Sequence, residues 1–271
     1  MAASSFQRKV KARVPSIAGA VPSLYTNQLL TSTGLPDLDT LLGGGLVLGS
    51  VLLLAEDTSA NFSRLMLKYF LSEGVAHTHS LLVTNSSPDC KLITQSLPSF
   101  ETGSSDASEG EGQGAENSSG DEKMKIAWRY QGQNTTKETN LNISNVKRTS
   151  HSFNLLKTVP KEVLEKCDVT VCDIAPSEDD GTWKNSSYLK VIQQLKEKVK
   201  SDGFLVEATA ETSEPRNVLR VGVQSVGLSL WGELDHQRSH LPKFLFSLRS
   251  VMRSCLGVAV VTLPSSLFRN V

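Results

Sequence analysis

Two acidic residues, Glu56 and Asp57, follow an apolar run at a place where nucleotide chemistry would need the opposite charge. In a phosphate-binding loop of the form G-x-x-x-x-G-K-[ST], glycines let backbone N–H groups approach the phosphates, lysine neutralises charge and a hydroxyl binds Mg²⁺. The corresponding segment, residues 56–63, contains neither glycine nor lysine. Its acids would repel a triphosphate by on the order of several kcal/mol. We therefore expect a nucleotide-binding scaffold that has lost its contacts to phosphate.

Five residues could retain part of a nucleotide site. Four lie in segment 56–63 and the fifth is a later acid: Glu56, Asp57, Ser59, Ser63 and Asp173. Asp173 ends an apolar run, and in RecA-like ATPases an acid in this position holds the hydration shell of Mg²⁺. A lone Asp after an apolar run is a weak motif, so we favour a carboxylate that only caps the turn at Ala175 and Pro176. We predict no catalytic residue, no cofactor and no metal site.

The pattern of apolar residues predicts the elements that position this segment. Residues 32–57 indicate a short helix, a glycine turn at 43–45 and a buried strand at 51–55. An apolar stripe predicts a helix next, and a second buried strand follows at 79–84. Continuous apolar residues at 258–263 predict a central parallel strand. The expected fold class is α/β, with a RecA-like, mostly parallel sheet flanked by helices and a degenerate P-loop.

Two stretches of unusual composition interrupt the globular pattern. Residues 1–23 combine basic and small residues with prolines, so we expect a flexible basic arm. Residues 98–122 contain seven acids, no base and few apolar side chains, so we expect a disordered acidic insertion. Alternation at 124–130 then indicates an edge or half-buried strand. We predict that residues 24–271 form one RecA-like domain around this insertion.

Bulk properties exclude several classes of protein. The 271 residues have a formal net charge of zero, so the overall field neither attracts nor excludes nucleic acid. The four cysteines include no C-x-x-C pair, and we expect buried free thiols in a reducing compartment. No stretch approaches the roughly 18 apolar residues of a membrane span. We expect a soluble intracellular protein without membrane contact.

Trp231 is the aromatic residue with the most suggestive surroundings. It lies in the segment 227–232, between residues that favour a flexible turn. A tryptophan in this setting is a plausible anchor at a subunit interface. Alternatively, it fills the core of its own domain.

Four segments together resemble the fourth subunit of the eukaryotic Elongator complex, over nearly the whole chain. They are the Ser-Thr-Gly-Leu-Pro-Asp-Leu-Asp opening with Leu42 to Gly45, the Glu56-Asp57 replacement of the P-loop, the Lys-Ile-Ala-Trp-Arg-Tyr segment at 125–130, and residues 219–232. The chain ends soon after Leu263, whereas members of this family continue through further strands. We therefore expect a shortened form.

The resemblance implies an accessory subunit without normal Walker motifs. It implies a heterohexameric RecA-like ring with the fifth and sixth Elongator subunits, which binds tRNA in the cytoplasm and also the nucleus. The ring would join a catalytic core that installs carboxymethyl-type modifications on wobble uridine. Because phosphate contacts dominate RNA affinity, the candidate tRNA contacts are basic residues: Lys147, Arg148, Arg216, Arg220, Arg249 and Arg253.

Two other functions remain open. A RecA- or KaiC-like ATPase would need ring neighbours to supply the missing groups in trans, as an arginine finger does. A DNA recombinase-mediator paralogue would share the opening motif. Copurification with Elongator subunits or with a recombination complex would discriminate between these possibilities.

Overall fold

Five parallel strands form the central sheet. Their order across the sheet is β4 (Val51–Glu56), β10 (Gly257–Pro264), β9 (Leu219–Val223), β5 (Ser80–Asn85) and β8 (Val169–Asp173). The computed structural model describes residues 17–23, 25–85, 90–101, 150–174, 181–206 and 216–268. All of these residues belong to one unit of the chain.

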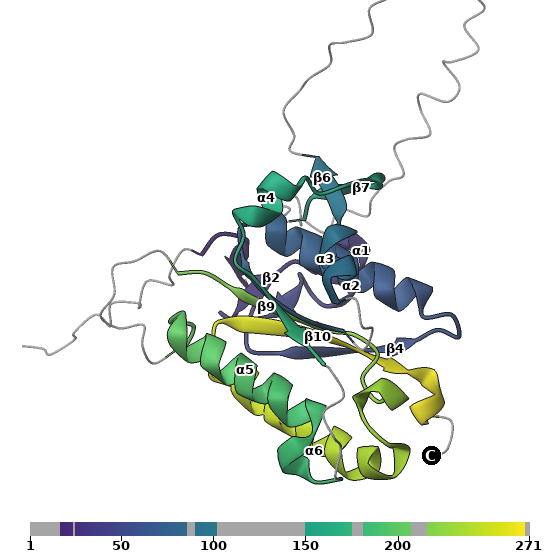
Figure 1. Cartoon of the computed structure of the whole chain (residues 1–271). Helices are drawn as coiled ribbons and strands as arrows, with labels where there is room; N and C mark the ends of the chain where they lie inside the picture. Colours follow the sequence, from purple (N-terminus) through teal and green to yellow (C-terminus); the bar gives the residue numbers. More distant parts are fainter. Residues whose placement is uncertain are drawn as a thin grey trace, which may run out of the picture. The chain divides into compact units, whose positions relative to one another are not determined.

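Helices cover both faces of this sheet (Figure 1). One face carries α2 (Asn61–Ala76) and α3 (Cys90–Gln95), and the other carries α5 (Ser187–Ser201) and α6 (Leu234–Arg253). The predicted α/β class, a parallel sheet flanked by helices, is therefore confirmed, and the arrangement is consistent with a RecA-like fold.

Each face of the sheet contributes to its own hydrophobic core. Leu81 and Val83 of β5 pack in the cluster that contains the buried side chains of α2. Leu82, between them, packs in the cluster formed by α5 and α6. Successive side chains of a strand point to opposite faces, so a strand between two helical layers is apolar throughout.

The position of two strands tests the predicted pattern. Every residue of β10 is buried, and β10 pairs with β4 on one side and β9 on the other, as predicted for a central strand. Among the described residues β4 pairs only with β10, and Leu53 is 49% exposed. The prediction of a buried strand at 51–55 is therefore wrong, because an apolar run does not reveal whether a strand has one neighbour or two.

Short elements complete the unit. A small antiparallel sheet and an antiparallel pair lie outside the central sheet, together with short helices: β1 (Ala20–Pro22), β2 (Leu29–Thr31), β3 (Leu46–Val47), α1 (Pro36–Leu41), β6 (Pro98–Glu101), β7 (Ser152–Thr158), α4 (Lys161–Glu165), η2 (Trp183–Asn185), η4 (Ser229–Trp231) and η5 (Ser265–Phe268).

Two predicted boundaries differ from the structure. Residues 17–22 were expected in the flexible arm, but Ile17 is buried and β1 pairs with β2. Residues 98–101 were expected in the acidic insertion, but they form β6, which pairs with β7. Backbone pairing orders these short segments, whose composition alone does not indicate structure. Residues 1–16, the rest of the insertion and the strand expected at 124–130 lie outside the described residues.

The described part of the chain contains no helix with the length and apolar character needed to cross a membrane. Among the described residues, Cys167, Cys172 and Cys255 are buried and form no disulfide, as predicted. Burial raises the pKa of Cys255 to about 12, so this thiol stays protonated.

Candidate functional site

The carboxylate of Glu56 is built into the sheet. Glu56 is the last residue of β4 and is buried. Its Oε1 accepts hydrogen bonds from Oγ of Ser225 at 2.7 Å and from Oγ1 of Thr262 at 2.6 Å. The backbone N–H of Ser225 also donates to Oγ1 of Thr262, at 2.7 Å. Glu56 therefore joins β4 to β10 and to the loop after β9, and its Oε1 faces neighbouring strands rather than a ligand.

Asp57 occupies the N-terminal end of α2. Its Oδ1 accepts a hydrogen bond from the backbone N–H of Phe62 at 3.3 Å, and its Oδ2 accepts one from Oγ of Ser59 at 2.6 Å. The bond from Ser59 makes the largest contribution to lowering the pKa of Asp57, so this carboxylate is ionised at neutral pH. A helix N-terminus normally attracts an anionic ligand. Here the chain supplies the anion itself.

The other two predicted members of a nucleotide site are used elsewhere. Ser63 is buried, and its hydroxyl donates to the backbone carbonyl of Ala60 at 3.2 Å. Asp173 is exposed at the end of β8, at the opposite edge of the sheet from β4. Four strand spacings of about 4.8 Å separate these edges by roughly 19 Å. The grouping of Asp173 with Glu56 and Asp57 is therefore wrong, because the order of strands in the chain is not their order in the sheet.

Arg220 is a structural residue, which corrects its prediction as a tRNA contact. Its side chain is 0% exposed. Nε donates to Nδ1 of His79, Nη1 donates to the carbonyls of Ser32 and Phe70, and Nη2 donates to Oγ1 of Thr31, all at 2.8 to 3.0 Å. Burial lowers the pKa of Arg220 to about 10, so the guanidinium keeps its charge at neutral pH. A charged residue in a strand commonly faces solvent, but helices cover both faces of β9.

Trp231 fills the core of its own unit and is not an exposed interface anchor. It is 1% exposed. Its ring stacks on Tyr188 with a centroid distance of 5.0 Å and packs at an angle against Phe244 at 5.8 Å. The alternative interpretation of Trp231 is therefore correct, because α5 and α6 supply aromatic partners that the local sequence does not reveal.

The remaining predicted tRNA contacts have different positions. Arg249 and Arg253 are exposed on α6, one turn apart. Arg216 is half-buried just before β9. Lys147 and Arg148 lie outside the described residues.

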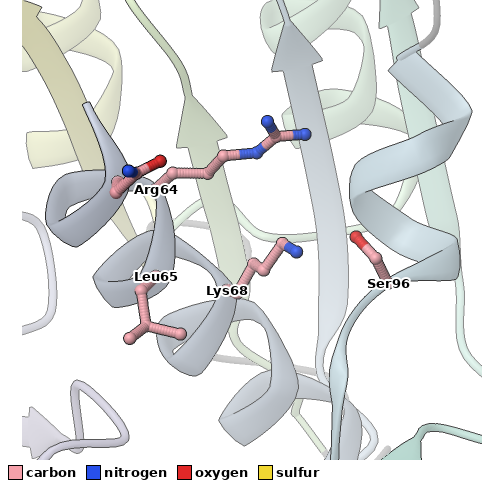
Figure 2. Close-up of a pocket in the computed structure, with 5 residues that line it drawn as sticks. Arg64, Leu65, Lys68 and Ser96 are labelled. Atoms are coloured by element: carbon pink, nitrogen blue, oxygen red, sulfur yellow. The ribbon is translucent and has the colours of Figure 1, made fainter. Parts of the chain in front are cut away.

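A basic pocket lies beside α2 (Figure 2). Its volume is about 570 Å³, and its lining residues are Asn61, Arg64, Leu65, Lys68 and Ser96. Figure 2 shows the side chains of Arg64 and Lys68 extending from α2 in the same direction, with Ser96 across from Lys68. Ser96 directly follows α3, so the pocket lies between the two helices of one face.

The two cations of this pocket have no acidic partner within ion-pair distance in the part of the chain that the structure describes. Arg64 and Lys68 are four residues apart and therefore lie on one face of α2. Burial lowers the pKa of Lys68, and the charge of Arg64 lowers it further. Two like charges in a partly desolvated hollow favour an anionic ligand. The spacing of this pair was visible in the sequence, but the pair was not among the predicted contacts.

Fold and site together define the class of protein: an α/β domain with a parallel sheet, consistent with a RecA-like fold, in which Asp57 accepts a hydrogen bond at the N-terminal end of α2. Residues 13–271 match the family model described as PAXNEB protein. The chain therefore belongs to the PAXNEB family.

Curated relatives agree with this assignment. Elongator complex protein 4 of Xenopus laevis is 34% identical over 280 residues, which cover 98% of this chain and 67% of the frog protein. The Mus musculus protein of the same name is 35% identical over 287 residues, covering 98% of this chain and 67% of that protein. The Homo sapiens protein is 34% identical over 272 residues, covering 95% of this chain and 63% of that protein.

Proposed function

We propose that this chain is a non-catalytic subunit of the Elongator complex. The similarity to Elongator complex protein 4 extends over 95 to 98% of the chain in frog, mouse and human. Similarity of this extent favours the same place in the same complex.

The observation that carries the proposal is the hydrogen bond of Asp57 at the N-terminal end of α2, which supports a role without nucleotide hydrolysis. Asp57 takes the position at the helix N-terminus that a phosphate would need, and Glu56 is hydrogen-bonded to Ser225 and Thr262. No residue between 56 and 63 offers a cation or a glycine to a phosphate. The chain therefore keeps the architecture of a nucleotide-binding domain and needs no nucleotide cofactor.

The basic pocket supports a contact to the phosphate backbone of tRNA. Arg64 and Lys68 converge on one hollow, whereas Arg249 and Arg253 lie on α6, on the opposite face of the sheet. Arg64 is exposed, as Arg249 and Arg253 are, but it shares the pocket with Lys68, which is partly buried and therefore less screened by water and salt. We assign the main tRNA contact to the α2 face, with Arg249 and Arg253 as the weaker alternative.

The assembled state is part of the same proposal. The fifth and sixth Elongator subunits would form a heterohexameric ring with this chain, and the ring would hold tRNA for a core that modifies wobble uridine. The exposed edge of β4, with Leu53 half-exposed, is a surface of the kind that a partner strand covers. Such a complex would work in the cytoplasm and also in the nucleus.

Copurification from cells tests the place of the chain in a complex. Recovery of the fifth and sixth Elongator subunits with the tagged full chain is the expected result. Recovery of a DNA recombination complex in their place would overturn the proposal in favour of a recombinase mediator.

The RNA surface is tested in the copurified complex at physiological salt. Arg64→Glu combined with Lys68→Glu should weaken tRNA binding by at least tenfold, because each removes one phosphate contact and adds repulsion. The matched variant, Arg249→Glu with Arg253→Glu, also reverses two charges one helical turn apart. A larger loss for the α6 variant would place the RNA on the other face.

Calorimetry of the full chain with ATP and Mg²⁺ tests the absence of a nucleotide site. We expect no heat of binding at millimolar ATP. Micromolar binding that Asp173→Ala abolishes would restore the ATPase alternative.

A further inference from the structure

Three side chains that can bind a metal ion, two from α2 and one from a distant part of the chain, lie together at the C-terminal end of α2. Glu73 and His77 lie one turn apart on this helix, and His151 lies directly before β7. Nε2 of His77 is 3.0 Å from Oε1 of Glu73, and Nδ1 of His151 is 3.1 Å from the same oxygen. One ligand atom from each residue lies within 4.8 Å of the other two.

The spacing of these atoms fits a small tetrahedral ion. Zinc–nitrogen and zinc–oxygen bonds of about 2.0 to 2.2 Å at tetrahedral angles place neighbouring ligand atoms roughly 3.4 Å apart. The two distances to Oε1 of Glu73 are already close to this value, and the two histidine nitrogens, which lie within 4.8 Å of each other, would move toward it by side-chain rotation. Two imidazoles and one carboxylate suit Zn²⁺, whereas Mg²⁺ and Ca²⁺ prefer oxygen ligands alone.

The carboxylate of Glu73 is ionised and can therefore act as an anionic ligand. Its side chain is 0% exposed. Burial raises the pKa of Glu73, but the bonds from His77 and the backbone N–H of His151, together with the charge of Arg220, lower it more, and the net pKa lies below the ordinary value. The described hydrogen bonds of Arg220 go to four other acceptors, so the carboxylate keeps lone pairs for a metal. His77 and His151 are 18% and 26% exposed, which leaves an entry path.

We propose that Glu73, His77 and His151 form a binding site for one Zn²⁺ ion, with water in the fourth position. The ion would join α2 to the point where the chain enters β7. Ring contacts between Tyr69 and Phe153, at 5.4 Å, and between Phe100 and His151, at 5.7 Å, already bring the β6–β7 pair against this helix. Zinc therefore reinforces the packing of the β6–β7 pair against α2. This grouping could not be seen in the sequence, because His151 lies 74 residues after His77 and 78 residues after Glu73.

Metal binding is measured on the full chain purified without a polyhistidine tag. After dialysis against micromolar Zn²⁺, elemental analysis should find one Zn²⁺ per chain, and Co²⁺ should give the visible absorption of a tetrahedral site. Glu73→Gln, His77→Ala and His151→Ala should each lower Zn²⁺ affinity by at least tenfold, because each removes one ligand. Millimolar Mg²⁺ should not compete.

His236→Ala provides the matched control, because His236 also lies near a glutamate, with 3.6 Å between its Nε2 and Oε2 of Glu233 at the start of α6, but the described residues supply no third ligand there. Its Zn²⁺ binding should equal that of the unmodified chain. Hydrogen exchange across β7 should slow on addition of Zn²⁺ in the unmodified chain and not in His151→Ala, a readout that does not depend on the stability of the variants. Absence of bound zinc, or a His151→Ala variant that binds zinc as tightly as the unmodified chain, would show that the three residues form hydrogen bonds only.

Discussion

Nε of Arg220 donates a hydrogen bond to Nδ1 of His79 at 2.9 Å, and both side chains are completely buried. Nε2 of His79 in turn donates to the backbone carbonyl of Ala18 at 2.8 Å, so both ring nitrogens are used by a neutral imidazole. The same guanidinium bonds Thr31 and Ser32. Arg220 and His79 therefore attach the N-terminal strands to the central sheet.

Arg220→Met should destabilise the chain strongly. The methionine side chain keeps most of the apolar volume of Arg220 but has no N–H group. The buried carbonyls of Ser32 and Phe70 therefore lose the hydrogen bonds that the guanidinium donates to them. Breaking such an arrangement costs about 3 to 5 kcal/mol of unfolding free energy. Urea unfolding followed by circular dichroism measures it. Arg249→Met on exposed α6 should change stability by less than about 0.5 kcal/mol, and a similar small effect at Arg220 would refute its structural role.

His79 should make stability depend on pH. Burial and then the charge of Arg220 lower the pKa of His79 from 6.5 to about 3, and His77 stacks on the same ring at 5.4 Å. Between these two pKa values the unfolded chain binds a proton that the folded chain does not bind. The free energy of unfolding contributed by His79 is therefore fully present above pH 6.5 and falls by about 1.4 kcal/mol per pH unit below it.

The comparison that isolates this contribution uses His79→Gln, because glutamine can also accept from Arg220 and donate to Ala18 but does not titrate. Urea unfolding between pH 4 and pH 7, with a chelator present, should show a shallower decline for the variant. Parallel pH profiles would mean that His79 is protonated in the folded chain.

Trp231→Ala should unfold the α5–α6 side of the domain more easily. The variant leaves a cavity between Tyr188 and Phe244, and removal of a buried tryptophan costs about 3 to 5 kcal/mol. The midpoint of urea unfolding should fall accordingly, while Leu230→Ala, at a neighbouring half-exposed position, should have a much smaller effect. If Trp231→Ala changed subunit association without changing stability, the tryptophan would be an interface residue after all.

Periodicity predicted the elements better than their neighbours. Phe244, Leu248 and Met252 of α6 recur at helical spacing in the sequence and all lie in the core, and the continuous apolar run of β10 indicated its central position. The apolar stripe of α2 is a less accurate guide, because Phe62 lies at helical spacing from Leu65 and Met66 and is nevertheless 71% exposed. Phe62 lies in the first turn of α2, where side chains extend past the edge of the core.

Site residues were harder to predict because their roles depend on contacts distant in sequence. Glu56 stands out in the sequence as an acid where a phosphate-binding loop would begin, but its partners Ser225 and Thr262 lie more than 160 residues away. Arg220 is a charged residue within an apolar stretch, and only the fold shows that β9 is a central strand with both faces covered. Arg64 and Lys68, by contrast, form a basic pair at helical spacing that the sequence alone contained.

Glu56 and Asp57 should differ in their effects on stability, although they are adjacent. Glu56→Ala removes the common acceptor of two buried hydroxyls and should cost about 1 to 3 kcal/mol. Asp57→Ala removes an exposed helix cap and should lower the thermal midpoint less. Differential scanning calorimetry of both variants measures the contrast. Equal shifts would indicate that Glu56 is no better connected to the sheet than Asp57.

The salt dependence of tRNA binding separates a phosphate contact from an indirect effect of the same mutation. Each phosphate contact that is lost reduces the slope of log affinity against log salt by about 0.7 to 0.9. Arg64→Gln and Lys68→Gln in the copurified complex should each reduce this slope by roughly that amount. Asn61→Ala, which changes the pocket lining without changing charge, should leave the slope unaltered. Weaker binding with an unchanged slope in the two glutamine variants would mean that these cations do not meet phosphate and that the pocket serves another anion.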